Sequence, residues 1–443
     1  MPEMLGAASA VNPFTYGKPI SDPTRFFGRQ REVHQVFSRL KNGEFEPSSI
    51  VGEHRIGKSS LLNYIGHSDV RNSFGLDPEQ YVFVKVDLQI IDPKTNPSRL
   101  WQELLRLSAA QSRNAESKQL LGEAAKRETI DTFVLNDLFD ELDQREQYTV
   151  FLLDEFEKIT SNANFGPDFF YGLRSLAIGH HLSLVTSSRR ELIELCHSEA
   201  IRSSPFFNIF ANINLRPFSE DDARTLITTS LERVSMTFSD DEVLHVMELS
   251  GCYPYFVQAA SCVLFDAYAA GLDESKRLPR LARDFPQQAI PHLRNYWQNS
   301  DVSERIVLAA LALMQHQGKA GGRTFTLGEM RDVYSRSPQT LAELEKRGLV
   351  LARADRYALF SPVFSDWLVD EIADTLHDDV DYETWLRSNE SVVDRLEPAV
   401  KKELGAILPR VSGKYRELFV NWASDPRNLV AVAGLVRGAL GLP

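Results

Sequence analysis

The stretch that decides the fold runs from Ser48 to Leu62 and reads SSIVGEHRIGKSSLL. It contains Gly52, four further residues, and then Gly57, Lys58 and Ser59, which is the spacing of a phosphate-binding P-loop. The two glycines let the backbone turn tightly, so that its N–H groups point inward at phosphate oxygens. We therefore expect every residue of this loop to contribute to a phosphate site: Gly52, Glu53, His54, Arg55, Ile56, Gly57, Lys58, Ser59 and Ser60.

Two side chains of this loop have predicted roles of their own. Lys58 would reach the β and γ phosphates as a point charge, and the Ser59 hydroxyl is placed to ligate Mg²⁺. Leu61, Leu62 and Ile65 follow at helical spacing, so a helix would direct the partial positive charge of its N-terminus at the same anion. The competing interpretation, a glycine turn beside an exposed lysine, is disfavoured by this flanking strand and helix.

Length and composition limit the class of protein. A chain of 443 residues is expected to form two or three domains, and its net charge of −12 opposes non-specific binding to nucleic acid or anionic membrane. No apolar run has the length of a membrane span, and the first residues lack the basic region of a signal peptide. Cys196, Cys252 and Cys262 show no metal-ligand spacing, so we expect reduced thiols in a cytoplasmic protein.

A second informative stretch, Tyr148 to Ile159, reads YTVFLLDEFEKI. Its apolar run predicts a buried strand that ends in Asp154 and Glu155, at the end of a parallel strand where ligands bind. Asp154 would hold Mg²⁺ through its water shell, and Glu155 would orient and deprotonate the attacking water. The alternative, a strand end with two solvated acids, is weakened by the P-loop upstream.

Three further segments complete a predicted sheet: Tyr81 to Leu88, Leu182 to Ser187 and Phe210 to Leu215. Their alternation with helical runs predicts an α/β fold with a parallel, doubly wound sheet. Arg189 and Arg190 follow the predicted strand Leu182 to Ser187, and one of them would contact the γ phosphate. The alternative is that these arginines only cap a surface strand.

The segment before the P-loop also has a candidate binding role. Residues 1–24 are rich in Pro, Gly and Ser and predict an extended arm. The pattern F-F-G-R-x-x-E follows, in which Phe27, Gly28 and Arg29 would supply an apolar wall and backbone contacts for an adenine ring. The alternative is the start of an ordinary surface helix.

Beyond residue 217 the sequence turns helical. The predicted order is a core over 25–217, a helical lid over 218–275, a connector over 276–300, a winged helix over 301–373 and a helical C-terminal region over 374–443. The winged-helix segment holds nine Lys/Arg against ten Asp/Glu, which is a poor balance for a protein that reads DNA. The region over 374–443 shows no catalytic constellation and is a candidate site for a protein partner.

Together these motifs resemble the STAND class of AAA-like P-loop NTPases. The resemblance rests on the two phosphate motifs, the extra strand between them, Thr186 to Arg189, the element Gly251-x-x-Pro254 and the winged helix. It implies a five-stranded core with the P-loop strand central, and ATP used as a conformational switch with slow hydrolysis. The resemblance also implies a role for each matching residue. Lys58 and Ser59 would bind phosphate and Mg²⁺, Asp154 would coordinate Mg²⁺, and Glu155 would be the base. Arg189 would be the arginine that senses the γ phosphate, and Tyr253 and Pro254 would lie near the adenine.

Two departures from the family pattern leave residues open. Gly251 stands one residue further from Pro254 than usual, so that Cys252 or Tyr253 would occupy the turn. The arginine follows a doubled serine, so that Arg190 would replace Arg189 if the loop shifts by one residue.

Three function classes follow from this resemblance. The first is a nucleotide-gated switch in signalling or defence, able to assemble into homo-oligomers with nucleotide bound. The second is an AAA+ ATPase of the origin-recognition type, which should carry an arginine early in the third lid helix; Tyr255 to Tyr268 has none. The third is a module that holds ADP without hydrolysing it. No N-K-x-D-type motif for guanine occurs, and the preference for ATP over GTP rests on the resemblance.

Overall fold

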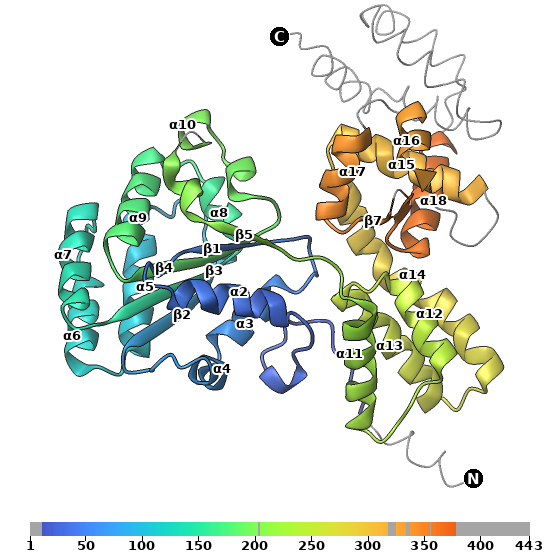
Figure 1. The fold of residues 1–443 in the computed structure, drawn as a ribbon, viewed down its shortest axis with the longest axis horizontal. Helices are drawn as coiled ribbons and strands as arrows, with labels where there is room; N and C mark the ends of the chain where they lie inside the picture. Colours follow the sequence, from blue (N-terminus) through green and yellow to red (C-terminus); the bar gives the residue numbers. More distant parts are fainter. Residues whose placement is uncertain (1–10, 203, 318–324, 334–336, 355, 378–443) are drawn as a thin grey trace, which may run out of the picture. The chain divides into compact units, whose positions relative to one another are not determined.

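The computed structural model describes residues 11–202, 204–317, 325–333, 337–354 and 356–377 (Figure 1). Contacts group them into two compact units. The first comprises Pro13–Ser235 with Tyr253–Tyr255, and the second comprises Asn12, Met236–Cys252 and the described residues from Phe256 onward. The first residues of the predicted arm and the C-terminal region from residue 378 lie outside the described residues, so the helices and partner predicted there stay predictions.

A five-stranded parallel sheet forms the centre of the first unit. Its strands are β1 (Ser48–Val51), β2 (Tyr81–Asp87), β3 (Tyr148–Asp154), β4 (Leu182–Ser188) and β5 (Ala211–Asn214). They lie in the order β2-β3-β4-β1-β5, so the predicted parallel α/β sheet is confirmed. The P-loop strand β1 is second from one edge, and the expectation of a central position is therefore wrong, because only β5 is added beyond it.

Helices cover both faces of this sheet (Figure 1). Phe151 and Leu153 of β3 face a core that includes Trp101, Phe139 and Phe170 of three covering helices. Leu152 points to the other face, where α3 packs. The helices of this unit are α2 (Gln30–Lys41), α3 (Lys58–Gly66), α4 (Ser68–Ser73), α5 (Pro97–Gln111), α6 (Ala115–Ala124), α7 (Thr132–Asp143), α8 (Glu157–Thr160), α9 (Pro167–Gly179), α10 (Glu199–Arg202) and α11 (Glu220–Glu232). Short 3₁₀ turns occur at Pro23–Arg25, Leu88–Ile90, Leu192–Leu195 and Pro205–Ile209.

The second unit begins with helices whose starts were readable from the sequence. Ser239 caps α12 with a reciprocal pair of hydrogen bonds to Glu242, as the predicted helix start requires. The elements are α12 (Asp240–Ser250), α13 (Pro254–Ala269), α14 (Glu274–Gln298), α15 (Val302–Gln317), β6 (Phe325–Thr326), α16 (Leu327–Val333), α17 (Ser337–Lys346), β7 (Val350–Arg353), β8 (Arg356–Leu359) and α18 (Pro362–His377). From α15 onward, three helices precede an antiparallel β7–β8 hairpin, the order that the winged-helix prediction requires. The name winged helix itself stays a prediction.

Two segments differ from the predicted division of the chain. Residues 276–300, expected as a Pro-containing connector, lie almost wholly in the single helix α14. Leu281, Phe285, Ala289 and Leu293 form a buried stripe at a spacing of four residues, and its burial outweighs the cost of three internal prolines. The predicted lid is also divided, because contacts group α11 with the first unit and α12 with the second. The domain boundaries therefore stay predictions.

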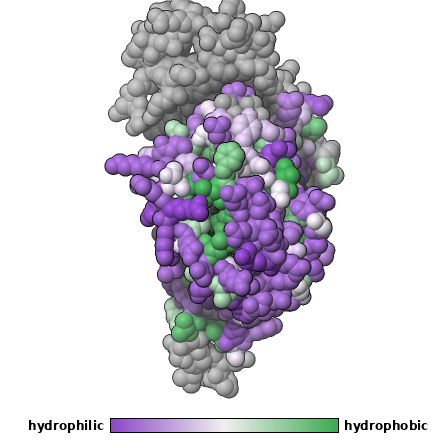
Figure 2. All heavy atoms as spheres, turned by 90° about the vertical axis from the view of Figure 1, so that its left-hand side faces the viewer, coloured by the Kyte–Doolittle hydropathy of each residue, from purple (hydrophilic) through white to green (hydrophobic). Residues whose placement is uncertain are grey.

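Within the described residues, no helix has both the length and the apolar character needed to cross a membrane. Figure 2 shows the side of the first unit that carries α6 and α7, where an apolar patch lies among polar side chains. Large exposed apolar residues of α7 and α9 include Phe133, Tyr171 and Ile178. Nothing in the structure shows what would cover them, so we assign no role to this patch.

Candidate nucleotide site

The P-loop connects β1 to α3 at the carboxyl edge of the sheet. Gly52 N donates to Ser188 O at 3.1 Å, which fixes the start of the loop to the end of β4. A Cβ at Gly52 would lie 2.9 Å from Ile56 Cγ2, so this close approach requires glycine. Gly57 has a φ of 104°, in the region that favours glycine, and α3 begins at the next residue. The loop therefore has the backbone that the sequence predicted.

Lys58 lies inside this loop, with 5% of its surface exposed. Its Nζ donates to Gly52 O at 2.8 Å and to Glu53 O at 3.3 Å. It also stands at the first position of α3, where the N–H groups of a helix have no partner within the helix. A phosphate bound here would meet both the ammonium group and these N–H groups, so the position suits an anion.

The predicted Mg²⁺ ligands Asp154 and Ser59 both lie near a second lysine, Lys85. Lys85 Nζ, on β2, lies 3.9 Å from Asp154 Oδ2 and 3.4 Å from Ser59 O. Burial lowers the pKa of Lys85, and the neighbouring charge of Asp154 acts in the opposite direction. The Ser187 hydroxyl donates to the buried Asp154 carboxylate. Both predicted Mg²⁺ ligands therefore lie near the Lys85 ammonium group, Asp154 through its carboxylate and Ser59 through its main-chain oxygen.

Glu155 directly follows β3 and has a φ of 57°, a conformation that is uncommon for residues other than glycine. Its backbone N donates to Ser187 Oγ at 3.2 Å, which holds the turn against β4. Its charge also reaches the P-loop: burial and Lys58 lower the pKa of His54, and Glu155 acts in the opposite direction. The predicted base and the predicted phosphate-binding lysine therefore both act on the charge of His54.

Arg189 joins the same group. It follows β4, its charge is among those that lower the pKa of His54, and its backbone N donates to Glu157 Oε1 at 3.2 Å. The next residue, Arg190, has its carbonyl held by Ser188 Oγ at 2.6 Å. The effect of its charge on the pKa of His54 favours Arg189 over Arg190 as the arginine near the loop.

Glu157 is a residue that sequence reasoning missed. Burial raises the pKa of its carboxyl, the charge of Glu155 adds to that effect, and Lys58 opposes it. It stands in the first turn of α8, so from sequence it is indistinguishable from an ordinary acid at a helix start. The only available signal was its place beside two acids already assigned to the site.

The predicted adenine wall contains a structural arginine. Gly28 has a φ of 65°, and a Cβ there would lie 3.0 Å from the Phe218 ring. Arg29 is 8% exposed, donates from Nη2 to Ile56 O at 3.1 Å and places its guanidinium 4.8 Å from the centroid of Phe218. Burial lowers the pKa of Arg29. Phe27 is half-buried. The segment contacts the P-loop through Arg29, and its predicted role at an adenine ring stays a prediction.

The backbone before Pro254 shows whether Cys252 or Tyr253 occupies the turn. Gly251 and Cys252 both have a φ of 57°, so Cys252 takes the additional position in the turn. Tyr253 is fully buried. Pro254 begins α13.

One residue of the predicted phosphate loop, Ser60, is hydrogen-bonded to the N-terminal arm. Ile20 N donates to Ser60 Oγ at 3.0 Å, and Asn63 Nδ2 donates to Ile20 O at 2.8 Å. The Ser60 side chain therefore binds the arm, and a direct side-chain contact from Ser60 to nucleotide is not supported. Arg55 places its guanidinium 4.9 Å from the ring centroid of Tyr255.

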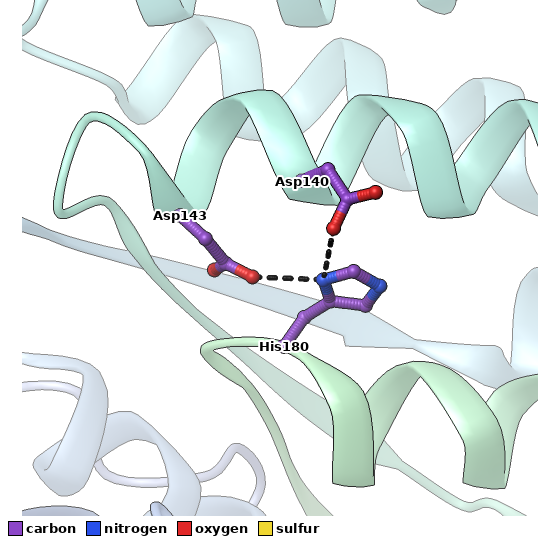
Figure 3. A group of neighbouring side chains, drawn as sticks. All are labelled: Asp140, Asp143 and His180. Carbon is purple, nitrogen blue, oxygen red and sulfur yellow. Dashed lines mark hydrogen bonds and ion pairs between the residues drawn. The ribbon is translucent and has the colours of Figure 1, made fainter.

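Another cluster of potential ligands lies away from this site. Asp140, Asp143 and His180 each offer one atom within 4.8 Å of the others (Figure 3). His180 Nδ1 lies 2.8 Å from Asp143 Oδ2, and its Nε2 lies 3.1 Å from Asn136 Oδ1. Because these residues precede β3 and β4, they stand at the opposite end of the strands from the P-loop. We interpret them as a hydrogen-bonded cluster that ties the end of α9 to α7.

Comparison with known proteins identifies the family. The family described as Novel STAND NTPase 2 matches residues 42–317, which are 276 of the 443 residues. The chain belongs to this family. The predicted STAND resemblance, the P-loop α/β fold and a nucleoside triphosphatase activity are thereby confirmed, and nucleotide binding with them.

One solved structure supports the fold. The chain is similar to the ORC2 protein of Aeropyrum pernix, solved as ADPNP–ADP complexes, with 14% identity, 82% of this chain and 99% of that chain covered, and a TM-score of 0.50. It is also similar to a Walker-type ATPase of Pyrococcus abyssi, with 18% identity, coverage of 80% and 99%, and a TM-score of 0.49. Identities this low speak to the fold alone. No curated protein sequence matches this chain.

Proposed function

We propose that this STAND-family NTPase binds ATP with Mg²⁺, hydrolyses it slowly and works as a nucleotide-gated switch in signalling or defence. The observation that carries the proposal is the meeting of three strand ends at the P-loop. The charges of Lys58, Glu155 and Arg189 all act on the imidazole of His54, although these residues come from three separate segments. A phosphate-binding lysine, a carboxylate and an arginine at one edge are the groups that phosphoryl transfer needs.

Each residue has a defined task in this proposal. Lys58 and the first N–H groups of α3 bind the β and γ phosphates, and Arg189 stabilises charge on the γ phosphate. Glu155 orients the attacking water and accepts its proton. Asp154 and Ser59 would hold Mg²⁺, which when bound neutralises charge between the β and γ phosphates. Phe27, Gly28, Tyr253 and Pro254 would border the adenine.

Two sets of contacts support a switch rather than a simple hydrolase. The arm binds the P-loop helix through Ser60 and Asn63, and Tyr255 contacts both Arg55 and Tyr16. A rearrangement of the P-loop on nucleotide exchange would therefore change the contacts of the arm and of the start of α13. A partner at residues 374–443 and a homo-oligomer formed with ATP would be the output. The buried thiol of Cys196, whose pKa burial raises to about 11, suits the reducing cytoplasm.

The test begins with the nucleotide itself. Protein is purified, denatured, and its released nucleotide identified by chromatography; we expect adenine nucleotide, and recovery of guanine nucleotide alone would refute ATP specificity. Glu155→Gln should keep ATP binding and lower the hydrolysis rate about 100-fold or more. The control is Glu116→Gln on α6, since Glu116 has a side chain 80% exposed and lies outside the site.

The same variant tests the switch. Glu155→Gln loaded with ATP is examined by size-exclusion chromatography with light scattering, beside the ADP-bound wild type. An increase in mass only with ATP supports the switch. Rapid, steady turnover with no change in mass would favour the alternative, a DNA-associated ATPase of the origin-recognition type. Hydrolysis by Glu155→Gln at the wild-type rate would mean that another residue is the base.

A further inference from the structure

The turn after β3 carries a third carboxyl group, that of Glu157, and this group holds the neighbouring strand end. Glu155 N donates to Ser187 Oγ at 3.2 Å, and Arg189 N donates to Glu157 Oε1 at 3.2 Å. The first contact ties the backbone beside the predicted base to β4. The second ties the backbone of the predicted sensing arginine to the turn after β3. Glu157 thus connects the two segments that must act together in hydrolysis.

The second oxygen of Glu157 has a different environment. Oε2 is buried and has no hydrogen-bond partner among the described residues. A buried acceptor without a partner costs about 1–3 kcal/mol, and more when it is charged, so its presence asks for an explanation. Glu157 comes just after the end of β3 and accepts from Arg189 N just after the end of β4, so its carboxyl lies at the edge of the sheet that carries the P-loop. An acceptor in that position is available to a donor that arrives with the nucleotide.

We propose that Glu157 is a positioning residue for hydrolysis. Oε1 holds the backbone at Arg189. Oε2 accepts a hydrogen bond from a donor that reaches it only when ATP is bound, either a water molecule at the γ phosphate or the Arg189 guanidinium. The inference rests on the proposed ATPase function. Because small displacements of a positioned group cost rate far more than affinity, the loss of Glu157 should appear in kcat and leave nucleotide binding intact.

A merely structural role makes a different prediction. Glu157 lies in the first turn of α8, where an acid also stabilises a helix start. If that were its function, removal of the charge would lower the melting temperature and weaken nucleotide affinity together with the rate. Measurement of all three quantities on the same variants separates these roles.

The experiment uses Glu157→Gln in the full chain. The amide oxygen can still accept from Arg189 N, while the second acceptor is replaced by a donor. We expect kcat for ATP to fall about 10- to 100-fold, with KM and the ADP dissociation constant within about twofold of wild type. The control, Glu116→Gln, removes an exposed carboxylate and should leave every quantity unchanged. If Glu157→Gln does not fold, Glu157→Asp, which keeps the charge but shortens the reach, is measured in the same way and should show the same loss of kcat.

The outcomes distinguish this inference from the function on which it rests. A wild type that hydrolyses ATP together with a Glu157→Gln variant of equal kcat would refute the inference and leave the ATPase function standing. A parallel loss of melting temperature, affinity and rate would also refute it, in favour of a structural role. A wild type that binds ATP without any hydrolysis would overturn both.

Discussion

Ser187 offers the sharpest test of how the acidic strand end is built. Its hydroxyl donates to the buried Asp154 carboxylate and accepts from Glu155 N at 3.2 Å. Ser187→Ala would leave a buried carboxylate oxygen and a buried N–H without this partner. A hydrogen bond to a charged group contributes about 1.5–3 kcal/mol, and we expect the free energy of unfolding to fall by about that amount. For a unit of this size that corresponds to a melting temperature lower by about 3–10 °C.

The same substitution elsewhere on β4 provides a matched control. Ser183 is as buried as Ser187, but its hydroxyl has no hydrogen-bond partner among the described residues. Ser183→Ala removes an unsatisfied polar group, so its effect on stability should be close to zero or slightly stabilising. Both variants are compared by thermal unfolding without nucleotide and by single-turnover ATP hydrolysis. Equal melting temperatures, or equal rates, in the two variants would refute the assignment of Ser187 as the link between Asp154 and Glu155.

Two further predictions concern glycine and lysine positions. Lys58→Ala should abolish nucleotide binding in a calorimetric titration, because it removes the ammonium group that the P-loop encloses; retention of ATP by this variant would contradict the phosphate site. Gly251→Ala should lower the free energy of unfolding by about 2–4 kcal/mol, since a Cβ there would lie 2.2 Å from Phe360 O in a left-handed backbone. Gly271→Ala has a similar φ with open space around it and should cost only about 1 kcal/mol, so equal losses in denaturant titrations would show that the contact with Phe360 is unimportant.

Local patterns were sufficient for the elements that hold the phosphate site. The P-loop spacing and the apolar runs before Asp154 and Ser188 are short, and each strand is nearly or wholly buried, so few other structures suit them. Strand order is different, because it depends on crossovers between distant segments. The sequence therefore predicted the strands correctly, whereas the central position of the P-loop strand, which the STAND resemblance implied, is wrong.

The wrong prediction over α14 shows that prolines alone do not exclude a helix. Three prolines, at positions 279, 286 and 291, argued for a connector. Each costs a helix about 3 kcal/mol in its interior, but the stripe that begins at Leu281 buries several apolar side chains against the unit. The stripe itself was visible in the sequence at helical spacing. Weighing that periodicity above the prolines would have predicted the helix.

Lys85 shows what a period-2 argument can add to the site. Val82, Val84 and Val86 of β2 face the core beneath α5, so the side chain between them, Lys85, must point to the α3 side. A charged residue there, near the carboxyl end of a buried strand, has to find an acceptor, and the sheet register sets β2 beside the strand that ends in Asp154. In the structure Nζ donates to Asn63 Oδ1 on α3 and lies 3.9 Å from Asp154 Oδ2, in agreement with both facts. Alternation along the strand, combined with the position of the neighbouring acid, therefore identifies a cation of the site that motif spacing alone had left unassigned.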